Sequence, residues 1–347
     1  MKNRKFLMLS HDLDVKKHRL AGNFMSEKLD GMRAVWIPQT AGRPIDEVFF
    51  ANVKKKKGKQ AVAIATGLWS RYGNIIHAPE DFTIQLPLDT ILDGELNFGR
   101  GGWKQTMQTV KDHVPGPDWK DVKFSIFDSP LPEQLFQDGR INDPQYQKMI
   151  HWQQAKVELG MSDDPSDSMS RIFEFTYKRL QTLGLNGPNV EVMHQELLPF
   201  NGPKALARYE EFLAEVLAAG GEGVIIRFSS SEWEPQRSNY MFRMKAELDS
   251  EAVVIGYTSG EEGKHHGKLG SLRVLWNNIT FDLSGFTDAE RELLPEYQQW
   301  AADNAKALEV NNDISGVFPR GTVVQFKYRE ITADGKPKEA RFYRKHD

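Results

Sequence analysis

The chain has no cysteine among its 347 residues. Disulfide bridges, thiolate nucleophiles and cysteine-ligated zinc are therefore excluded, and the composition fits a reducing compartment. No apolar run approaches the roughly 20 residues that a membrane-spanning helix needs. At the N-terminus the apolar stretch covers only residues 6–9 and charged residues follow at once, so it is too short for a secretory signal. We therefore expect a cytoplasmic protein.

The chain also has no excess of positive charge. It contains 45 Lys and Arg and 48 Asp and Glu, which gives a formal net charge of −3. The chain as a whole has no bulk attraction to nucleic acid, so any such binding must come from local patches. One basic patch consists of Lys54, Lys55, Lys56, Lys57 and Lys59, and a second begins at residue 320. Runs of charge are most often solvated turns, so the lysine cluster is either such a turn or a contact to a polyanion.

The length suits two domains, which we expect over residues 1–246 and 247–347. In the first, short β-rich segments are predicted at 34–37, 61–64, 90–92 and 122–127, with a helix over 204–219 that ends at Gly220-Gly221 and a strand over 223–227. The polar segment 246–250 is the expected hinge. Beyond it, short strands with glycine-rich turns predict a small barrel, interrupted by an acidic helical stretch over 288–309. Residues 161–170 are predicted to form a loop.

Lys28 stands two residues before the pair Asp30-Gly31 and five before Arg33. Alone, this pattern indicates a hairpin turn with a solvent-facing lysine. Other segments with a charged residue beside a strand or turn follow in order: SRYG at 70–73, LDGEL at 92–96, FSIFD at 124–128, EGVIIR at 222–227 and MFRMK at 241–245. Nucleotidyl transfer needs a nucleophile, cations for phosphate oxygens and carboxylates for a hard divalent metal, and together the segments supply all three.

In these segments the sequence resembles the covalent nucleotidyltransferases, and among them the minimal two-domain ATP-dependent DNA ligases. The match is close in SEKLDGMRAVW, WSRYGNIIHAP, LDGELNFGRG, GGEGVIIR, GKLGSL and ITADGKPKEARF, and it spans the chain from residue 24 onwards. The resemblance implies an α+β nucleotidyltransferase domain with ATP-grasp-like antiparallel sheets and helices, followed by an OB-fold β-barrel. It further implies a monomeric enzyme that uses ATP and Mg²⁺ to seal 5′-phosphate, 3′-hydroxyl nicks in duplex DNA.

The resemblance also implies a role for each motif residue. Lys28 would attack the α-phosphorus of ATP and carry AMP. A free lysine has a pKa of about 10.4, so it must lose its proton, which the charges of Arg33 and Lys245 would favour. The implied nucleotide-binding residues are Ser26, Lys28, Arg33, Arg71, Glu95, Phe127, Arg243 and Lys245, with Glu95 on the ribose and Phe127 on adenine. The implied metal-binding residues are Glu95, Glu222 and, more weakly, Asp30.

For DNA, the resemblance implies contacts by Arg71 and Arg237, and we expect the lysines of the basic cluster, Lys54 to Lys57, to help surround the duplex. Arg341 and Arg344, at the end of the chain, would orient pyrophosphate. The chain departs from the family pattern at Arg243, where lysine is usual, and arginine's planar fork does not simply replace a point charge. Each role has a plainer alternative: Phe127 as core, Glu95 as an exposed residue after a turn, Arg237 as a surface arginine, and Arg341 and Arg344 as a frayed terminus.

Other functions would use the same set of a nucleophilic lysine, cations and carboxylates. An RNA ligase or a capping guanylyltransferase uses the same lysine and similar carboxylates. A nucleic-acid-binding protein with a decayed site would retain the barrel, although it would have no reason to keep Lys28, Glu95, Glu222 and Lys245 together. The NAD-dependent ligases are disfavoured because they contain cysteine-ligated zinc and a longer chain with a nicotinamide module.

Overall fold

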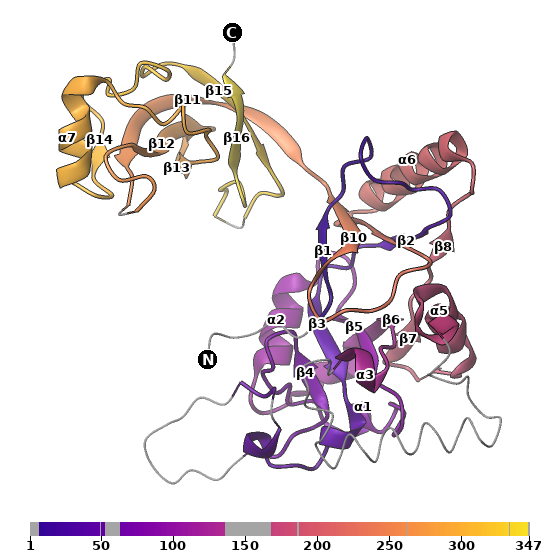
Figure 1. Cartoon of the computed structure of the whole chain (residues 1–347). Coiled ribbons are helices and arrows are strands. Elements are labelled where there is room, and N and C mark those ends of the chain that lie inside the picture. The colour runs from indigo at the N-terminus through magenta and orange to yellow at the C-terminus, as the bar shows by residue number, and fades with distance from the viewer. Residues whose placement is uncertain are drawn as a thin grey trace. The chain divides into compact units, whose positions relative to one another are not determined.

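The computed structural model describes residues 7–48, 50–52, 63–135, 168–185, 187–261, 263–332 and 334–345. It divides into two compact units, Met1–Lys245 and Ala246–Asp347, whose elements are labelled in Figure 1. Within these ranges no helix is both long and apolar enough to cross a membrane.

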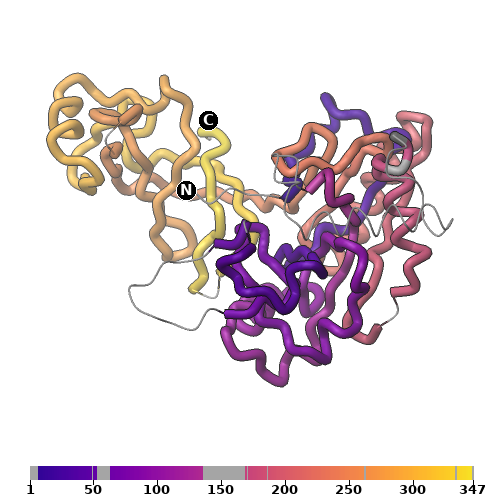
Figure 2. Tube along the Cα trace, turned by 60° about the horizontal axis from the view of Figure 1, so that its bottom comes forward, coloured from indigo at the N-terminus to yellow at the C-terminus, as the bar shows by residue number. Residues whose placement is uncertain are grey.

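Two five-stranded sheets form the first unit. One has the order β1-β10-β9-β2-β8, and the other has the order β4-β3-β5-β6-β7. Neighbouring strands are antiparallel except for two parallel pairs, β1 with β10 and β6 with β7; the former pair lies side by side in Figures 1 and 2. The strands are β1 (Leu9–Asp12), β2 (Phe24–Glu27), β3 (Met32–Trp36), β4 (Leu68–Ser70), β5 (Leu92–Asn97), β6 (Lys123–Asp128), β7 (Val190–Val192), β8 (Glu196–Leu197), β9 (Gly223–Arg227) and β10 (Arg237–Lys245).

Helices cover these sheets. The longest, α6 (Gly202–Ala218), begins where the Asn201 side chain accepts a hydrogen bond from the backbone of Lys204 and ends before Gly220, whose φ is 77°. Its buried face packs on Val224 and Phe242 of the first sheet. The others are α1 (Glu80–Thr83), α2 (Trp103–Lys111), α3 (Pro132–Leu135) and α5 (Phe173–Thr182), with 3-10 turns at Pro38–Thr40, Ile45–Glu47, Pro117–Asp121 and Ser168–Arg171.

The second unit is a strand-rich domain with one apolar core. Its sheet has the order β13-β12-β11-β15-β16, and β14 also pairs with β11. The elements are β11 (Leu248–Ser259), β12 (Leu269–Trp276), β13 (Ile279–Leu283), α7 (Pro295–Asp303), β14 (Leu308–Glu309), β15 (Val323–Tyr328) and β16 (Arg341–Lys345). The mixed α+β class expected from the sequence is therefore confirmed.

Several predicted boundaries need correction. The acidic helix over 288–309 is wrong in extent, because α7 has only nine residues and Leu308–Glu309 pairs with β11 instead. The strand predicted over 61–64 is wrong at residues 63–64, which form no regular strand. Residues 61–62 lie outside the described ranges. The segment 246–250, expected as a hinge, is already part of strand β11 from Leu248 onwards, where Leu248 pairs with Tyr328. Of the loop at 161–170, residues 168–170 lie in a 3-10 turn and the rest are not described.

Candidate active site

Lys28 lies where the chain crosses from one sheet of the first unit to the other. Strand β2 before it pairs with β8 and β9, whereas β3 after it pairs with β4 and β5. The pair Asp30-Gly31 is therefore not a hairpin turn, and that alternative is wrong. A Cβ on Gly31 would come within 2.3 Å of the Leu96 carbonyl oxygen, so glycine is needed because the crossing segment presses against β5.

The Lys28 side chain is held by Glu222. Its Nζ donates a hydrogen bond to Oε2 of Glu222, while the other carboxylate oxygen lies 3.6 Å from Nζ of Lys245. The three side chains are 21%, 18% and 24% exposed, respectively. The backbone N–H of Lys28 also donates to the carbonyl of Gly223 at 2.8 Å. Two amines, one in the crossing segment and one at the end of β10, thus share one carboxylate.

The glycines on either side of Glu222 allow its side chain to lie beside Lys28 and Lys245. A Cβ on Gly221 would lie 2.5 Å from a side-chain carbon of Val216 in α6, and a Cβ on Gly223 would lie 2.0 Å from the Met244 carbonyl oxygen. The chain can therefore turn from α6 into β9 only with small residues on both sides of the carboxylate. This packing places Glu222 between Lys28 and Lys245.

A second carboxylate, Glu95, stands on β5 opposite Arg33 of β3. Burial raises the pKa of Glu95 to about 7, against the lowering effects of Lys28, Arg33 and Arg71. These cations therefore lie near enough to act on the carboxyl. The turn expected before Glu95 is wrong, because Asp93-Gly94 lies inside β5, where a Cβ on Gly94 would be 2.6 Å from the Ser125 carbonyl oxygen.

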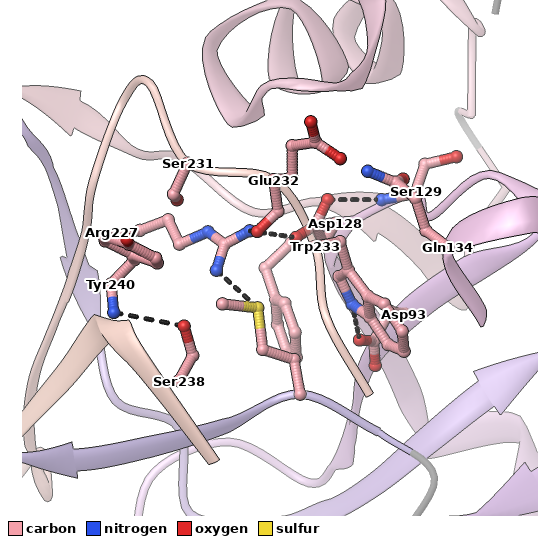
Figure 3. Close-up of polar contacts among 12 residues, drawn as sticks. Asp93, Asp128, Ser129, Gln134, Arg227, Ser231, Glu232, Trp233, Ser238 and Tyr240 are labelled. Atoms are coloured by element: carbon pink, nitrogen blue, oxygen red, sulfur yellow. Dashed lines mark hydrogen bonds and ion pairs between the residues drawn. The ribbon is translucent and has the colours of Figure 1, made fainter. Parts of the chain in front are cut away.

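Arg33 is bound within the protein. Its Nε and one terminal nitrogen each donate to a different oxygen of Asp93 at 2.6 Å, and its guanidinium carbon lies 4.4 Å from the centre of the Phe127 ring. Asp93 is fully buried and also accepts a hydrogen bond at 3.0 Å from the indole of buried Trp233 (Figure 3). Arg33, which was predicted to favour the neutral form of Lys28, is thus itself paired with Asp93. The cation that shares Glu222 with the nucleophile is Lys245.

A buried ion pair adjoins Asp93. Asp128, at the end of β6, lies 3.6 Å from the guanidinium of Arg227, at the end of β9. The same guanidinium donates to the Glu232 carbonyl at 3.1 Å and to the sulfur of Met8, and Figure 3 shows it beside Asp128 and Glu232. Both charged side chains are less than 10% exposed. The sequence patterns did not identify Asp93, Asp128, Arg227 or Trp233 as site residues. The first three nevertheless lie in the motifs LDGEL, FSIFD and EGVIIR.

The remaining predicted residues of the first unit lie as follows. Ser26 is buried on β2 and Asp30 is partly buried in the crossing segment. Arg71 follows β4 and its guanidinium carbon lies 4.7 Å from the Tyr72 ring centre. Two predicted site residues on β10 contact β1: Arg243 donates to Asp12 at 2.9 Å, and Arg237 donates to the Ser10 carbonyl.

Two groups of predicted residues fall elsewhere. Arg341 and Arg344 belong to β16 of the second unit, where Arg341 pairs with Glu247 and Arg344 donates to Gln325 at 2.6 Å. They are ordered strand residues, so the frayed-terminus alternative is wrong for both. The lysines of the basic cluster, Lys54 to Lys57 and Lys59, lie outside the described residues.

Comparison with known proteins supports the arrangement. A family model of the DNA ligase OB-like domain matches residues 261–345. Over 339 residues the chain is 26% identical to the DNA ligase of Haemophilus influenzae, covering 97% of this chain and 91% of that protein. A solved structure from a study of DNA binding by the minimal scaffold of Lig E DNA ligases matches with a TM-score of 0.63 and 25% identity over 98% of both chains. Over nearly its whole length the chain is similar to DNA ligases, the minimal Lig E type among them.

The ligase fold is also seen at lower sequence similarity. A solved structure described as Pmar-Lig_Pre matches with a TM-score of 0.60 at 19% identity, covering 98% of this chain and 67% of that chain. The resemblance and the OB-like C-terminal domain expected from the sequence are therefore confirmed, while the roles of the individual site residues remain predictions.

Proposed function

We propose that this ligase seals 5′-phosphate, 3′-hydroxyl nicks in duplex DNA with ATP, and that Lys28 carries the adenylate. The observation that carries the proposal is the sharing of Glu222 between Lys28 and Lys245. An amine held beside a carboxylate and a second cation, at the crossing of two sheets, has the nucleophile, the proton acceptor and the phosphate-binding charge of a nucleotidyl transfer site.

In the first step the lone pair of Lys28 Nζ attacks the α-phosphorus of ATP. The nitrogen–phosphorus bond forms, the bond to the bridging oxygen breaks, and pyrophosphate leaves with the electron pair. Glu222, the hydrogen-bond partner of Nζ, takes the proton that must leave Nζ before its lone pair can attack, and Lys245 balances the charge on the α-phosphate oxygens. Phe127 supports the adenine ring, and Arg33, held by Asp93, supports Phe127 from its other face.

In the second step an oxygen of the 5′-phosphate at the nick attacks the phosphorus of lysyl-AMP, which frees Lys28 and forms a DNA-adenylate. In the third, the 3′-hydroxyl attacks the 5′-phosphate, the new phosphodiester forms and AMP leaves. Arg71, beside Glu95, and Arg243 and Arg237 on β10 are the proposed contacts to nucleotide and DNA phosphates. Arg341 and Arg344 of the second unit would orient the pyrophosphate leaving group.

Glu95 and Glu222 fit a divalent metal of the Mg²⁺ type, with a weaker contribution from Asp30. Their donors are carboxylate oxygens, the ligands that Mg²⁺ prefers. In the described part of the chain no three His, Cys, Asp or Glu side chains group as a metal site. Phosphate oxygens and water would therefore complete the coordination, as is usual for Mg²⁺. A bound Mg²⁺ would offset charge on the transferring phosphate.

Intact-mass spectrometry tests the proposal directly. Protein incubated with ATP and Mg²⁺ should gain one AMP, and the adduct should disappear when nicked duplex DNA is added. Lys28→Ala should gain nothing, whereas Lys204→Ala, which removes an exposed lysine of α6, should behave as the parent does.

Parallel incubations separate the alternatives. GTP in place of ATP, and nicked RNA or triphosphate-ended RNA in place of nicked DNA, test for a guanylyltransferase or an RNA ligase. A parent protein that never becomes adenylylated would support a binding protein with a decayed site. Adenylylation of Lys28→Ala would refute the assignment of the nucleophile.

A further inference from the structure

Two histidines outside the proposed active-site residues lie together in the first unit. His77 belongs to the WSRYGNIIHAP segment that also supplies Arg71, and His113 follows the end of α2. Nδ1 of His113 is 3.3 Å from Nε2 of His77, their ring centres are 5.3 Å apart, and the ring planes make an angle of 63°. The proposed ligase mechanism makes no use of this pair.

These distances match the geometry of two imidazoles bound to one tetrahedral ion. With metal–nitrogen bonds of about 2.0–2.1 Å, the two nitrogens lie about 3.3 Å apart and the ring centres about 5 Å apart. A straight hydrogen bond between two ring nitrogens at the same separation would place the centres farther from each other. The observed separations of 3.3 Å and 5.3 Å are close to the values for such a metal-bound pair.

Both rings are able to offer a lone pair. A neutral imidazole keeps one ring nitrogen unprotonated, and that nitrogen can bind a metal. His113 is exposed, so an ion can reach the pair from solvent. The ring that now donates at the contact needs only to carry its proton on its other nitrogen, which is the tautomer found in metal-bound histidines.

We propose that His77 and His113 form a two-histidine site for a borderline divalent transition ion, namely Zn²⁺ and, more strongly, Cu²⁺. Imidazole nitrogen suits these ions, and the affinity of such a site follows their usual order. Since no group of three possible ligand side chains occurs among the residues that the structure describes, water would fill the other positions. The absence of cysteine means that no thiolate competes for the ion.

The site would join two parts of the first unit that the backbone does not connect locally. It would tie the segment after β4, which carries Arg71, to the residues that follow α2. An ion bound only to the folded form stabilises that form in proportion to its concentration over its dissociation constant. A metal-dependent rise in thermal stability is therefore the expected signature, and it is independent of nick sealing.

The test uses the full-length chain without a histidine tag, first treated with EDTA. Thermal unfolding and isothermal titration calorimetry are measured with ZnCl₂ and, separately, with MgCl₂. The parent should show a Zn²⁺-dependent rise in Tm, whereas His77→Ala and His113→Ala should each bind Zn²⁺ at least about tenfold more weakly. His194→Ala, which removes an exposed histidine elsewhere, should match the parent, and Mg²⁺ should not distinguish the variants.

Equal Zn²⁺ responses in all four proteins, or a parent that binds no Zn²⁺, would overturn the site. Adenylylation of Lys28 with ATP and Mg²⁺ should be unchanged in both pair variants. A parent that binds Zn²⁺ through the pair but is never adenylylated would support the metal site while refuting the proposed function, so the two failures are distinguishable.

Discussion

The carboxylate of Asp93 accepts two hydrogen bonds from the guanidinium of Arg33, each 2.6 Å long. Asp93 is fully buried, and the side chain of Arg33 is 17% exposed. This fork joins β3 and β5, adjacent strands of the second sheet, and β3 begins where the crossing segment that carries Lys28 ends. It fixes the guanidinium against Phe127, so changes at Asp93 should affect both the fold and the proposed nucleotide site.

Replacing Asp93 by Asn should destabilise the protein by about 3 kcal/mol or more, because it leaves the charge of Arg33 without its partner. Urea denaturation of the parent and the variant measures the change. Asp89→Asn, at an exposed position nearby in the sequence, serves as the control and should change stability by less than about 1 kcal/mol. Equal effects at the two positions would contradict the role given to Asp93.

Trp233→Phe should cost about 1–2 kcal/mol, because it removes the indole N–H that donates to Asp93 while keeping an aromatic ring. Adenylylation should persist with a raised KM for ATP, since Arg33 and Phe127 lose part of their support. Trp103→Phe, at a 42% exposed position, is the matched control. A variant with the parent's stability and KM would show that the indole hydrogen bond supports neither.

Asp128 should make stability depend on pH in a distinctive direction. Burial raises the pKa of Asp128 to about 6 from an ordinary value of 3.8, so the folded state favours the protonated carboxyl. The contribution of this group is therefore fully present below pH 4 and is lost as the pH rises towards 6. The interval between the two pKa values corresponds to about 3 kcal/mol.

The measurement compares the parent with Asp128→Asn by urea denaturation between pH 4 and pH 7. Because the amide does not titrate, subtracting the two free energies of unfolding isolates the carboxyl from other groups. The parent should lose stability relative to the variant as the pH rises through this range. A difference that stays constant with pH would contradict the prediction.

Glu222→Gln should lower the rate of AMP incorporation at least about a hundredfold, because the amide cannot accept the proton from Lys28 or balance Lys245. Quenched time courses with labelled ATP give the rate. Glu210→Gln, which alters an exposed residue of α6, should leave it unchanged. Similar Tm values for the two variants would show that the loss is chemical, whereas an unimpaired Glu222→Gln would remove this carboxylate from the mechanism.

Joint replacement of Lys54, Lys55, Lys56 and Lys57 by Ala should weaken binding to nicked duplex DNA and reduce its salt dependence. Adenylylation should be unaffected, because the change concerns DNA phosphates only. Fluorescence anisotropy at several salt concentrations measures both quantities. The control removes the same charge from four exposed positions, Lys104, Lys111, Lys120 and Lys204, and equal effects in the two proteins would mean that the cluster has no special role.

The periodic parts of the fold could be predicted from the sequence. The helix expected over 204–219 is α6, and the strand expected over 122–127 is β6, because a continuous apolar face determines both. The turns expected at Asp30-Gly31 and Asp93-Gly94 were wrong for one shared reason. In both places glycine permits a neighbouring backbone to approach closely, which a local turn signal cannot distinguish from a hairpin.

The candidate site was predictable only in part. Lys28, Glu222 and Lys245 were each predicted as site residues, and in the structure their side chains are in contact. The pairing of Arg33 with Asp93 was not expected, because a sequence motif indicates a charged residue but does not show which buried group will form its ion pair. Partners such as Asp128 and Arg227 lie far apart in sequence, so only the fold identifies them.

The close contact of Gly31 with Leu96 has a mechanical consequence. Lys28 is tied to Gly223 in one sheet, and three residues later the chain is wedged against β5 of the other. The backbone that carries the Lys28 amine is therefore held at both ends, by one sheet on each side. A shift of one sheet relative to the other would move the amine. Substitutions in the apolar core that let the two sheets shift should therefore reduce the reactivity of the Lys28 amine, although they change no charged residue.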